Sequence, residues 1–155
     1  MSQRKDLAVK KFLEKPENFS DLFNGSIFCG RQVLRADMLE RLPGESALSF
    51  PDKEGQKVSE RRYRDAICKA SGSTTYAVFA VEGQEKTHYA MPVRNMIYDA
   101  LQYGKQVDQT ARRNQRNRRT RVQKKGEFLS GFYKEDKLIP VITFVIHFGA
   151  EEWDG

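Results

Sequence analysis

The sequence of 155 residues has few cysteines, few histidines and no long uninterrupted apolar stretch. Its two cysteines, Cys29 and Cys68, lie too far apart for a CxxC site, which argues against a zinc ribbon or a disulfide scaffold and suits a reducing compartment. The longest apolar run, residues 138–148, contains polar residues and a proline and is shorter than the ~20 residues that span a bilayer. Charges interrupt the first 15 residues, unlike a secretory signal. We therefore expect a cytoplasmic protein with no membrane contact.

The charge of the chain is concentrated in one segment. The chain carries 27 basic and 21 acidic residues, a net charge of +6. Eight cations and no acid lie within residues 112–125, and without them the chain has 19 basic and 21 acidic residues. These cations are Arg112, Arg113, Arg116, Arg118, Arg119, Arg121, Lys124 and Lys125. The basic character therefore belongs to this segment, residues 111–126, and needs its own explanation.

The remaining pattern predicts a single α/β domain over residues 1–155. Apolar residues at helical spacing predict one broken or two short helices before residue 24, interrupted at Pro16. Residues 43–59 predict mostly a loop, with a weak signal for a strand within residues 47–50. Residues 61–70 and 74–81 predict a hairpin, and the second strand lacks polar alternation, so helices should cover both of its faces. A buried strand is predicted at 138–148.

A long helix is predicted after Pro92, which suits a first helical turn. Its apolar residues recur at the spacing of one helix face, which we expect to face the core. These residues are Val93, Met96, Ile97, Ala100, Leu101 and Val107. Arg94 and Tyr98 lie one turn apart on the opposite face, where they could contact phosphate or face solvent.

Two acidic residues in the predicted hairpin suggest a site for a divalent cation. Glu82 ends an apolar strand, and an ionised carboxylate there is costly unless it is paired or binds a metal. Asp65 is a candidate co-ligand, the carbonyl of Gly83 a third, and Gln84 shares the strand face of Glu82. A turn centred on residue 72, however, would place Asp65 opposite residue 79, roughly 10 Å from Glu82 along the strand. Alternatively, both acids form ordinary ion pairs with neighbouring arginines or Lys69.

Five segments in order resemble the Rpn-type recombination-promoting nucleases, a family of transposase-like proteins in the PD-(D/E)XK superfamily. They are PENFSDLFNGSIFCGRQVL, RYRDAICK, FAVEGQ, HYAMPVRNMIYDAL and LIPVITFVIHFGAEEWDG, and together they cover nearly all of the chain. The resemblance implies a restriction-endonuclease-like α/β fold, with a central mixed sheet flanked by helices. It also implies a metal-dependent DNA endonuclease linked to recombination or mobile elements, with Mg²⁺ as cofactor, for which Mn²⁺ may substitute.

The resemblance assigns roles to individual residues. Asp65 and Glu82 would be the metal-binding and catalytic acids, with Gly83 beside them, and Gln84 would stand where the wider superfamily has a lysine. Glutamine donates and accepts hydrogen bonds but carries no charge, so charge stabilisation would fall on the metal ion and Arg94. DNA is the expected partner. Because many nucleases of this fold cut both strands as dimers, a homodimer is another expected assembly.

The basic segment and a few polar residues complete the predicted site. Eight unbalanced cations with no interleaved aromatic residue favour contact with nucleic-acid phosphates over base stacking; a solvated helix extension is the alternative. Asp21, Asn24, His88 and Tyr98 are accessory candidates, although caps or surface positions would explain the first three equally well.

Two other functions are consistent with the sequence. One is a non-catalytic DNA-binding module in which the acids are structural. The other is a protein-interaction fragment that presents Trp153 and neighbouring apolar surface to a partner.

Overall fold

The computed structural model describes residues 3–51, 57–72, 75–116 and 124–153. Within these ranges the elements are, in order, α1 (Gln3–Glu14), α2 (Pro16–Ser26), the 3₁₀ turn η1 (Ala36–Met38), β1 (Leu39–Arg41), β2 (Glu45–Pro51), β3 (Lys57–Tyr63), β4 (Ala66–Ser71), β5 (Thr75–Gln84), α3 (Met91–Arg116), α4 (Lys125–Ser130) and β6 (Val141–His147).

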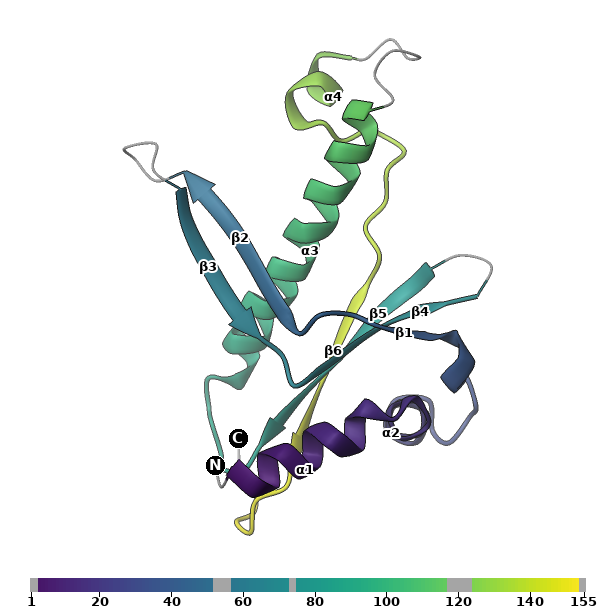
Figure 1. Ribbon diagram of the computed structural model, residues 1–155, viewed down its shortest axis with the longest axis vertical. Helices are drawn as coiled ribbons and strands as arrows, with labels where there is room; N and C mark the ends of the chain where they lie inside the picture. Colours follow the sequence, from purple (N-terminus) through teal and green to yellow (C-terminus); the bar gives the residue numbers. More distant parts are fainter. Residues whose placement is uncertain (1–2, 52–56, 73–74, 117–123, 154–155) are drawn as a thin grey trace.

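Four strands form a mixed sheet in the order β1-β4-β5-β6 (Figure 1). The pairs β1–β4 and β4–β5 are antiparallel, whereas β5 and β6 run parallel, joined by a long connection that contains α3 and α4. Strand β5 is buried from Ala77 to Gln84. This confirms the predicted α/β class, with a mixed sheet flanked by helices and its central strand covered on both faces.

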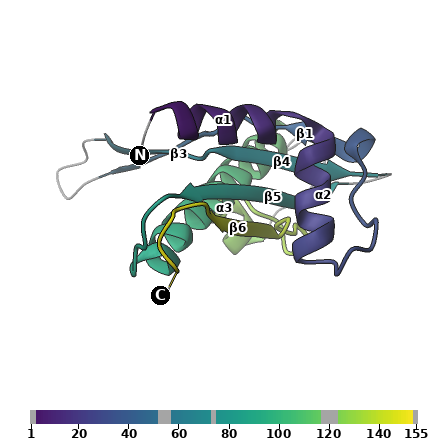
Figure 2. The ribbon, with the colours of Figure 1, turned by 90° about the horizontal axis from the view of Figure 1, so that it is seen from below.

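Helices cover the two faces of the sheet unequally (Figure 2). On one face, α1 and α2 contribute Leu13, Phe19 and Phe23 to the main core, and the ring of Phe23 lies 4.9 Å from that of Phe79 in β5. Pro16 starts α2 at its first turn, so the N-terminal region forms the two short helices that the sequence predicted. The other face lies under α3 and its core is smaller.

The segment between β1 and β4 differs from the prediction. Residues 45–51 and 57–63 form an antiparallel two-stranded sheet, where a loop was predicted for most of 43–59. The strand predicted over 61–70 is therefore two strands, because the chain leaves β3 at residue 63 and starts β4 at Ala66. Figure 1 shows this hairpin standing beside α3, which its first strand contacts.

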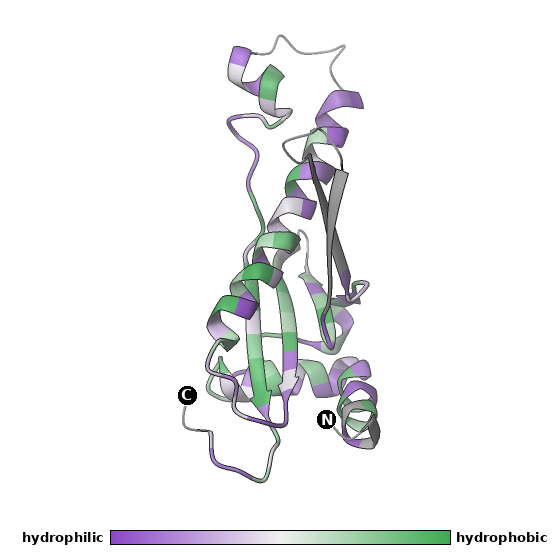
Figure 3. Cartoon of the chain, turned by 90° about the vertical axis from the view of Figure 1, so that its left-hand side faces the viewer, coloured by the Kyte–Doolittle hydropathy of each residue, from purple (hydrophilic) through white to green (hydrophobic). Residues whose placement is uncertain are grey.

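Helix α3 exists where it was predicted, but its predicted core face is only partly buried. Leu101 is buried as predicted, whereas Val93, Met96 and Ile97 are exposed, and Tyr98, predicted on the opposite face, is 3% exposed. The sheet beneath the first half of α3 carries polar and charged groups, so an aromatic ring with a hydroxyl fits that surface better than aliphatic side chains do. Figure 3 shows apolar and polar turns alternating along this helix. Within the described residues, no helix has both the length and the apolar composition needed to cross a membrane.

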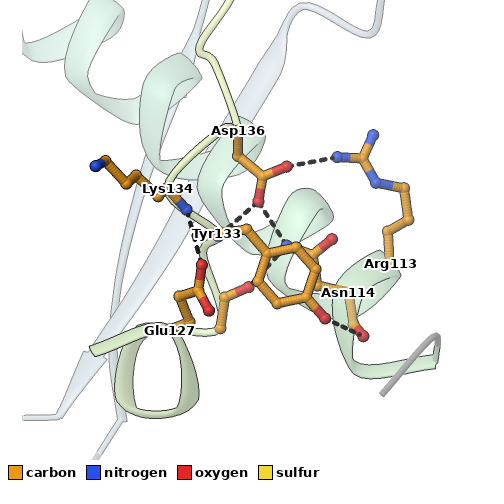
Figure 4. A network of polar contacts seen from close by, with 7 residues as sticks. Arg113, Asn114, Glu127, Tyr133, Lys134 and Asp136 are labelled. Carbon is orange, nitrogen blue, oxygen red and sulfur yellow. Dashed lines mark hydrogen bonds and ion pairs between the residues drawn. The ribbon is translucent and has the colours of Figure 1, made fainter. Parts of the chain in front are cut away.

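A network of polar contacts fastens α4 and the loop after it to the end of α3 (Figure 4). The amide of buried Asn114 donates to the carbonyl of Gly131 and to Asp136 Oδ2, which also accepts the N–H of Tyr133. Glu127 accepts the backbone N–H groups of Lys124 and Lys134. The last turns of α3 are therefore held in a fixed position.

Candidate metal and nucleic-acid site

The hairpin β4–β5 brings the two predicted acids together. Ala66 pairs with Val81, and this register holds as far as Ala70 and Ala77, so the next position outward places Asp65 beside Glu82. The pair Ser71 and Thr75 centres the turn on residue 73 rather than on residue 72, and a register shift separates this pair from Ala70 and Ala77. These two features remove the predicted offset of roughly 10 Å.

Asp65 is held by backbone and by α1. Its Oδ2 accepts the N–H of Gly83 at 2.8 Å, and its Oδ1 lies 3.4 Å from Nζ of Lys10. Two of the alternative partners proposed for this acid are used elsewhere, since Arg64 pairs with Asp99 and Lys69 pairs with Glu40. The side chains of the other two, Arg61 and Arg62, lie outside the described residues. Sequence reasoning missed Lys10, whose position depends on how α1 packs against the sheet.

Glu82 is a buried carboxyl group with incomplete hydrogen bonding. Its side chain belongs to a residue that is 2% exposed, and its Oε1 has no hydrogen-bond partner among the described residues. Burial and, to a smaller extent, the negative charge of Asp65 raise the pKa of Glu82 to about 7, while Arg64 and Arg94 oppose the shift. An orphaned oxygen beside a second carboxylate is the arrangement expected of an acid that binds a cation.

The ion pair between the buried guanidinium of Arg64 and Asp99 lies beside Glu82, and sequence reasoning missed it. The guanidinium of Arg64, 1% exposed, donates to Asp99 Oδ1 and to Thr143 Oγ1, both at 2.6 Å. Thr143 also donates to Asp99 at 2.6 Å, and the guanidinium carbon lies 5.2 Å from the centre of the Tyr98 ring. One hint was available, because Thr143 is a polar residue within an otherwise apolar strand.

Arg94 and Tyr98 lie on the sheet side of α3, close to the acids. Arg94 Nε donates to the Tyr98 hydroxyl at 3.1 Å, and this hydrogen bond is the main cause that raises the pKa of Arg94. Both residues line a cavity of about 470 Å³ with His88, whose side chain is exposed. Of the predicted accessory residues, His88 and Tyr98 thus share a cavity with a cation near Glu82.

Gly83 and Gln84 follow Glu82 at the strand end. A Cβ on Gly83 would lie 2.8 Å from Cε1 of Phe148 and 3.4 Å from Asp65 Oδ2, so only glycine fits without displacing a neighbour. Gln84 is 9% exposed and is paired in register with His147 of β6. Its side chain shares the strand face of Glu82, as predicted.

The other two accessory candidates have different surroundings. Asn24 is buried, and its amide bonds the backbone of Val33 and Leu34, which fixes the loop after α2. Asp21 is exposed on α2. Among the described residues neither makes a hydrogen bond or ion pair with Asp65 or Glu82, so the structure supports a structural role for Asn24.

The basic segment begins on the last turn of α3. Arg112, Arg113 and Arg116 are exposed there, and Arg113 donates to Asp136 at 3.2 Å. Lys124 and Lys125 are exposed at the start of α4. The remaining predicted cations, Arg118, Arg119 and Arg121, lie outside the described residues.

The oxygen atoms of Asp65 and Glu82 suit a hard divalent ion that binds to few protein ligands. The described residues contain no group of three or more His, Cys, Asp or Glu side chains that could surround a metal. Mg²⁺, however, keeps several waters and commonly binds through one or two carboxylates together with substrate phosphate. The pair Asp65 and Glu82 fits this minimum, and the unpartnered Glu82 oxygen supplies a free ligand atom.

No family model, no curated protein and no solved structure matches the chain.

Proposed function

We propose that the protein is a metal-dependent DNA endonuclease with a restriction-endonuclease-like core. One observation carries the proposal: two carboxylates meet at the ends of neighbouring strands, and one of them is buried with an unpartnered oxygen. The cations Arg94 and Arg64 lower the pKa of Glu82, which offsets part of the cost of ionising it. A site of this kind is suited to a cation and to an anionic substrate.

In this proposal each side chain has a defined task. Asp65 and Glu82, with the carbonyl of Gly83, would hold Mg²⁺ or Mn²⁺. The ion, when bound, would make a water molecule more acidic and neutralise charge on the phosphodiester. Gln84 would orient the attacking water through hydrogen bonds, and Arg94 would bind the phosphate. Arg64 would act through Glu82 as a positioning residue, because its terminal nitrogens Nη1 and Nη2 donate to Thr143 and Asp99.

The test is cleavage of supercoiled plasmid in Mg²⁺ by the wild type, Glu82→Gln and Asp65→Asn. We expect both variants to lose nicking while retaining the far-UV circular dichroism spectrum of the wild type. Mn²⁺ binding, followed by the loss of free-ion EPR signal, should weaken in parallel. Glu14→Gln, an exposed glutamate on α1, is the matched control and should cut normally. Unchanged nicking by both site variants would refute the proposal.

A non-catalytic DNA-binding module is the second candidate. Two observations favour it: Lys10 already contacts Asp65, and glutamine stands where a charged lysine would assist the reaction. This candidate predicts salt-sensitive binding of DNA, with no turnover in either Mg²⁺ or Mn²⁺.

A further inference from the structure

The face of α3 that carries Arg94 and Tyr98 continues to the end of the helix. Residues 102, 105, 109, 112 and 116 follow at alternating steps of three and four, the spacing that keeps side chains on one side of a helix. They are Gln102, Lys105, Gln109, Arg112 and Arg116. From Arg94 to Arg116 the helix rises roughly 33 Å at ~1.5 Å per residue. One polar and basic stripe therefore leads away from the two acids. Its members Tyr98 and Gln102 are buried, and the stripe reaches the surface from Lys105 onward.

Three connected depressions follow this stripe. The first, about 400 Å³, has Lys69, Gln102 and Lys105 in its wall; the second, about 360 Å³, lies between α3 and the start of the β2–β3 hairpin. The third, about 280 Å³, is lined by Gln109, Arg112, Arg113 and Arg116. All three share Gln109, so they form one groove, which we call the α3 groove.

The chemistry of the α3 groove favours phosphate over bases. Its lining combines cations and amides with the apolar residues Leu42, Pro43, Val78 and Ile139. Among the described residues it contains no aromatic ring on which a base could stack. Arg112 and Arg116 are exposed and make no ion pair with another described residue. Three acids lie along the groove, but Glu40 is paired with Lys69. Amide and guanidinium donors in a row are typical of contacts with the nucleic-acid backbone.

The groove is also rigid. The Tyr103 hydroxyl accepts the N–H of Val141, and Gln106 exchanges two hydrogen bonds with the backbone of Ile139. At the end of α3, the contacts of Asn114 in Figure 4 hold the last turns. Because the helix is fixed along its length, the backbone positions of its cations are set before any ligand binds, which lowers the entropic cost of binding.

We propose that the α3 groove binds the sugar–phosphate backbone of duplex DNA over part of one helical turn and leads it toward Asp65 and Glu82. The groove follows α3 from Gln102 to Arg116, roughly 21 Å at ~1.5 Å per residue, and Arg94 extends this path to roughly 33 Å, close to the roughly 34 Å of one turn of B-form DNA. Lys105, Gln109, Arg112 and Arg116 make the phosphate contacts, whereas Arg113 is turned toward Asp136. The direction of this path rests on the proposed function, but the binding surface itself does not.

The test measures binding without metal. Fluorescence anisotropy with a 30-base-pair duplex in EDTA compares the wild type with Lys105→Gln/Arg112→Gln/Arg116→Gln across a series of salt concentrations. Three lost phosphate contacts should reduce the slope of log K against log salt by about 2.7 and weaken binding by at least about 100-fold at 0.1 M salt. The variant Arg112→Gln/Arg116→Gln should reduce the slope of log K against log salt by about 1.8. Because it changes only exposed residues, it tests the groove even if the triple variant misfolds.

The control removes the same charge from the other side of the sheet. Lys11→Gln/Lys15→Gln/Arg31→Gln changes three exposed residues of α1, the junction to α2 and the loop after α2, and should retain nearly all of the affinity. An equal loss in this control would overturn the proposal, because net charge alone would then explain binding. Tighter binding of a single strand or of an RNA duplex would also overturn it.

Failure of this inference and failure of the proposed function give different results. If the groove variants bind like the wild type while the plasmid is still cut, the groove assignment is wrong and the nuclease stands. If binding is lost as expected but no plasmid is cut by the wild type, the nuclease is wrong and the groove stands.

Discussion

The buried carboxyl of Glu82 makes the stability of the protein depend on pH in a specific way. Its pKa is about 7 in the folded chain, against an ordinary value of 4.5. Because the folded state holds this proton more tightly, the group stabilises the fold fully below pH 4.5, and this stabilisation is lost as the pH rises through 7. At about 1.36 kcal/mol per pH unit, ionisation of Glu82 costs roughly 3 kcal/mol.

Glutamine at position 82 avoids that cost because it stays neutral. In EDTA, we expect Glu82→Gln to leave the free energy of unfolding nearly unchanged at pH 4.5 and to raise it by about 3 kcal/mol at pH 8. The melting temperature at pH 8 should rise by roughly 6–12 °C for a chain of this size. Urea unfolding followed by far-UV circular dichroism, repeated between pH 4.5 and 8.5, measures the difference.

The exposed control Glu14→Gln should change the unfolding free energy by less than about 0.5 kcal/mol at every pH. A gap between Glu82→Gln and the wild type that does not vary with pH would refute the reasoning. It would mean that Glu82 keeps its charge in the fold without cost. Addition of Mn²⁺ at pH 8 should raise the stability of the wild type but not that of Glu82→Gln, by mass action on a folded-state site.

Three further outcomes follow from contacts described above. Asp99→Leu should lower the free energy of unfolding by about 3–5 kcal/mol, because it leaves the Arg64 guanidinium buried without its charge partner; a loss below 1 kcal/mol in urea unfolding would contradict this. Gly83→Ala should cost about 1–3 kcal/mol through overpacking against Phe148, and adding Phe148→Ala should recover part of that loss. Burial raises the pKa of the Cys68 thiol to about 11, so DTNB at pH 8 should modify one thiol per folded chain and two in denaturant.

The strands and helices that the sequence predicted well are those whose own residues are enough to specify a helix or a strand. Strand β5 has a long apolar run, which is stable only when both faces are covered, and it is buried as predicted. Residues 138–148 form a strand over Val141–His147, but β6 is half-buried rather than buried, because it lies at the edge of the sheet that the described residues form. The N-terminal helices have their aromatic residues at helical spacing and a proline at the junction. The hairpin β2–β3 was missed because its residues are mixed in polarity. Its first strand contacts α3, and this packing stabilises strands that their own sequence does not specify.

The face of α3 could not be predicted because periodicity locates an apolar stripe but does not say what covers it. The first half of the helix packs on polar groups of the sheet, so Tyr98 is buried and Met96 is exposed. For the candidate site, the sequence predicted Asp65 and Glu82 but not their register, which depends on the length of one turn. It did not predict Arg64, whose partners come from two distant elements.

The placement of the site also has a consequence for the order in which its parts assemble on the ribosome. Both acids belong to a single hairpin, so they meet as soon as residues 65–84 have emerged, whereas β6 and Thr143 follow almost 60 residues later. During that interval the edge of β5 that later pairs with β6 remains exposed to solvent, and water solvates Glu82. Dehydration of this carboxyl therefore waits until β6 has been made and has paired with β5.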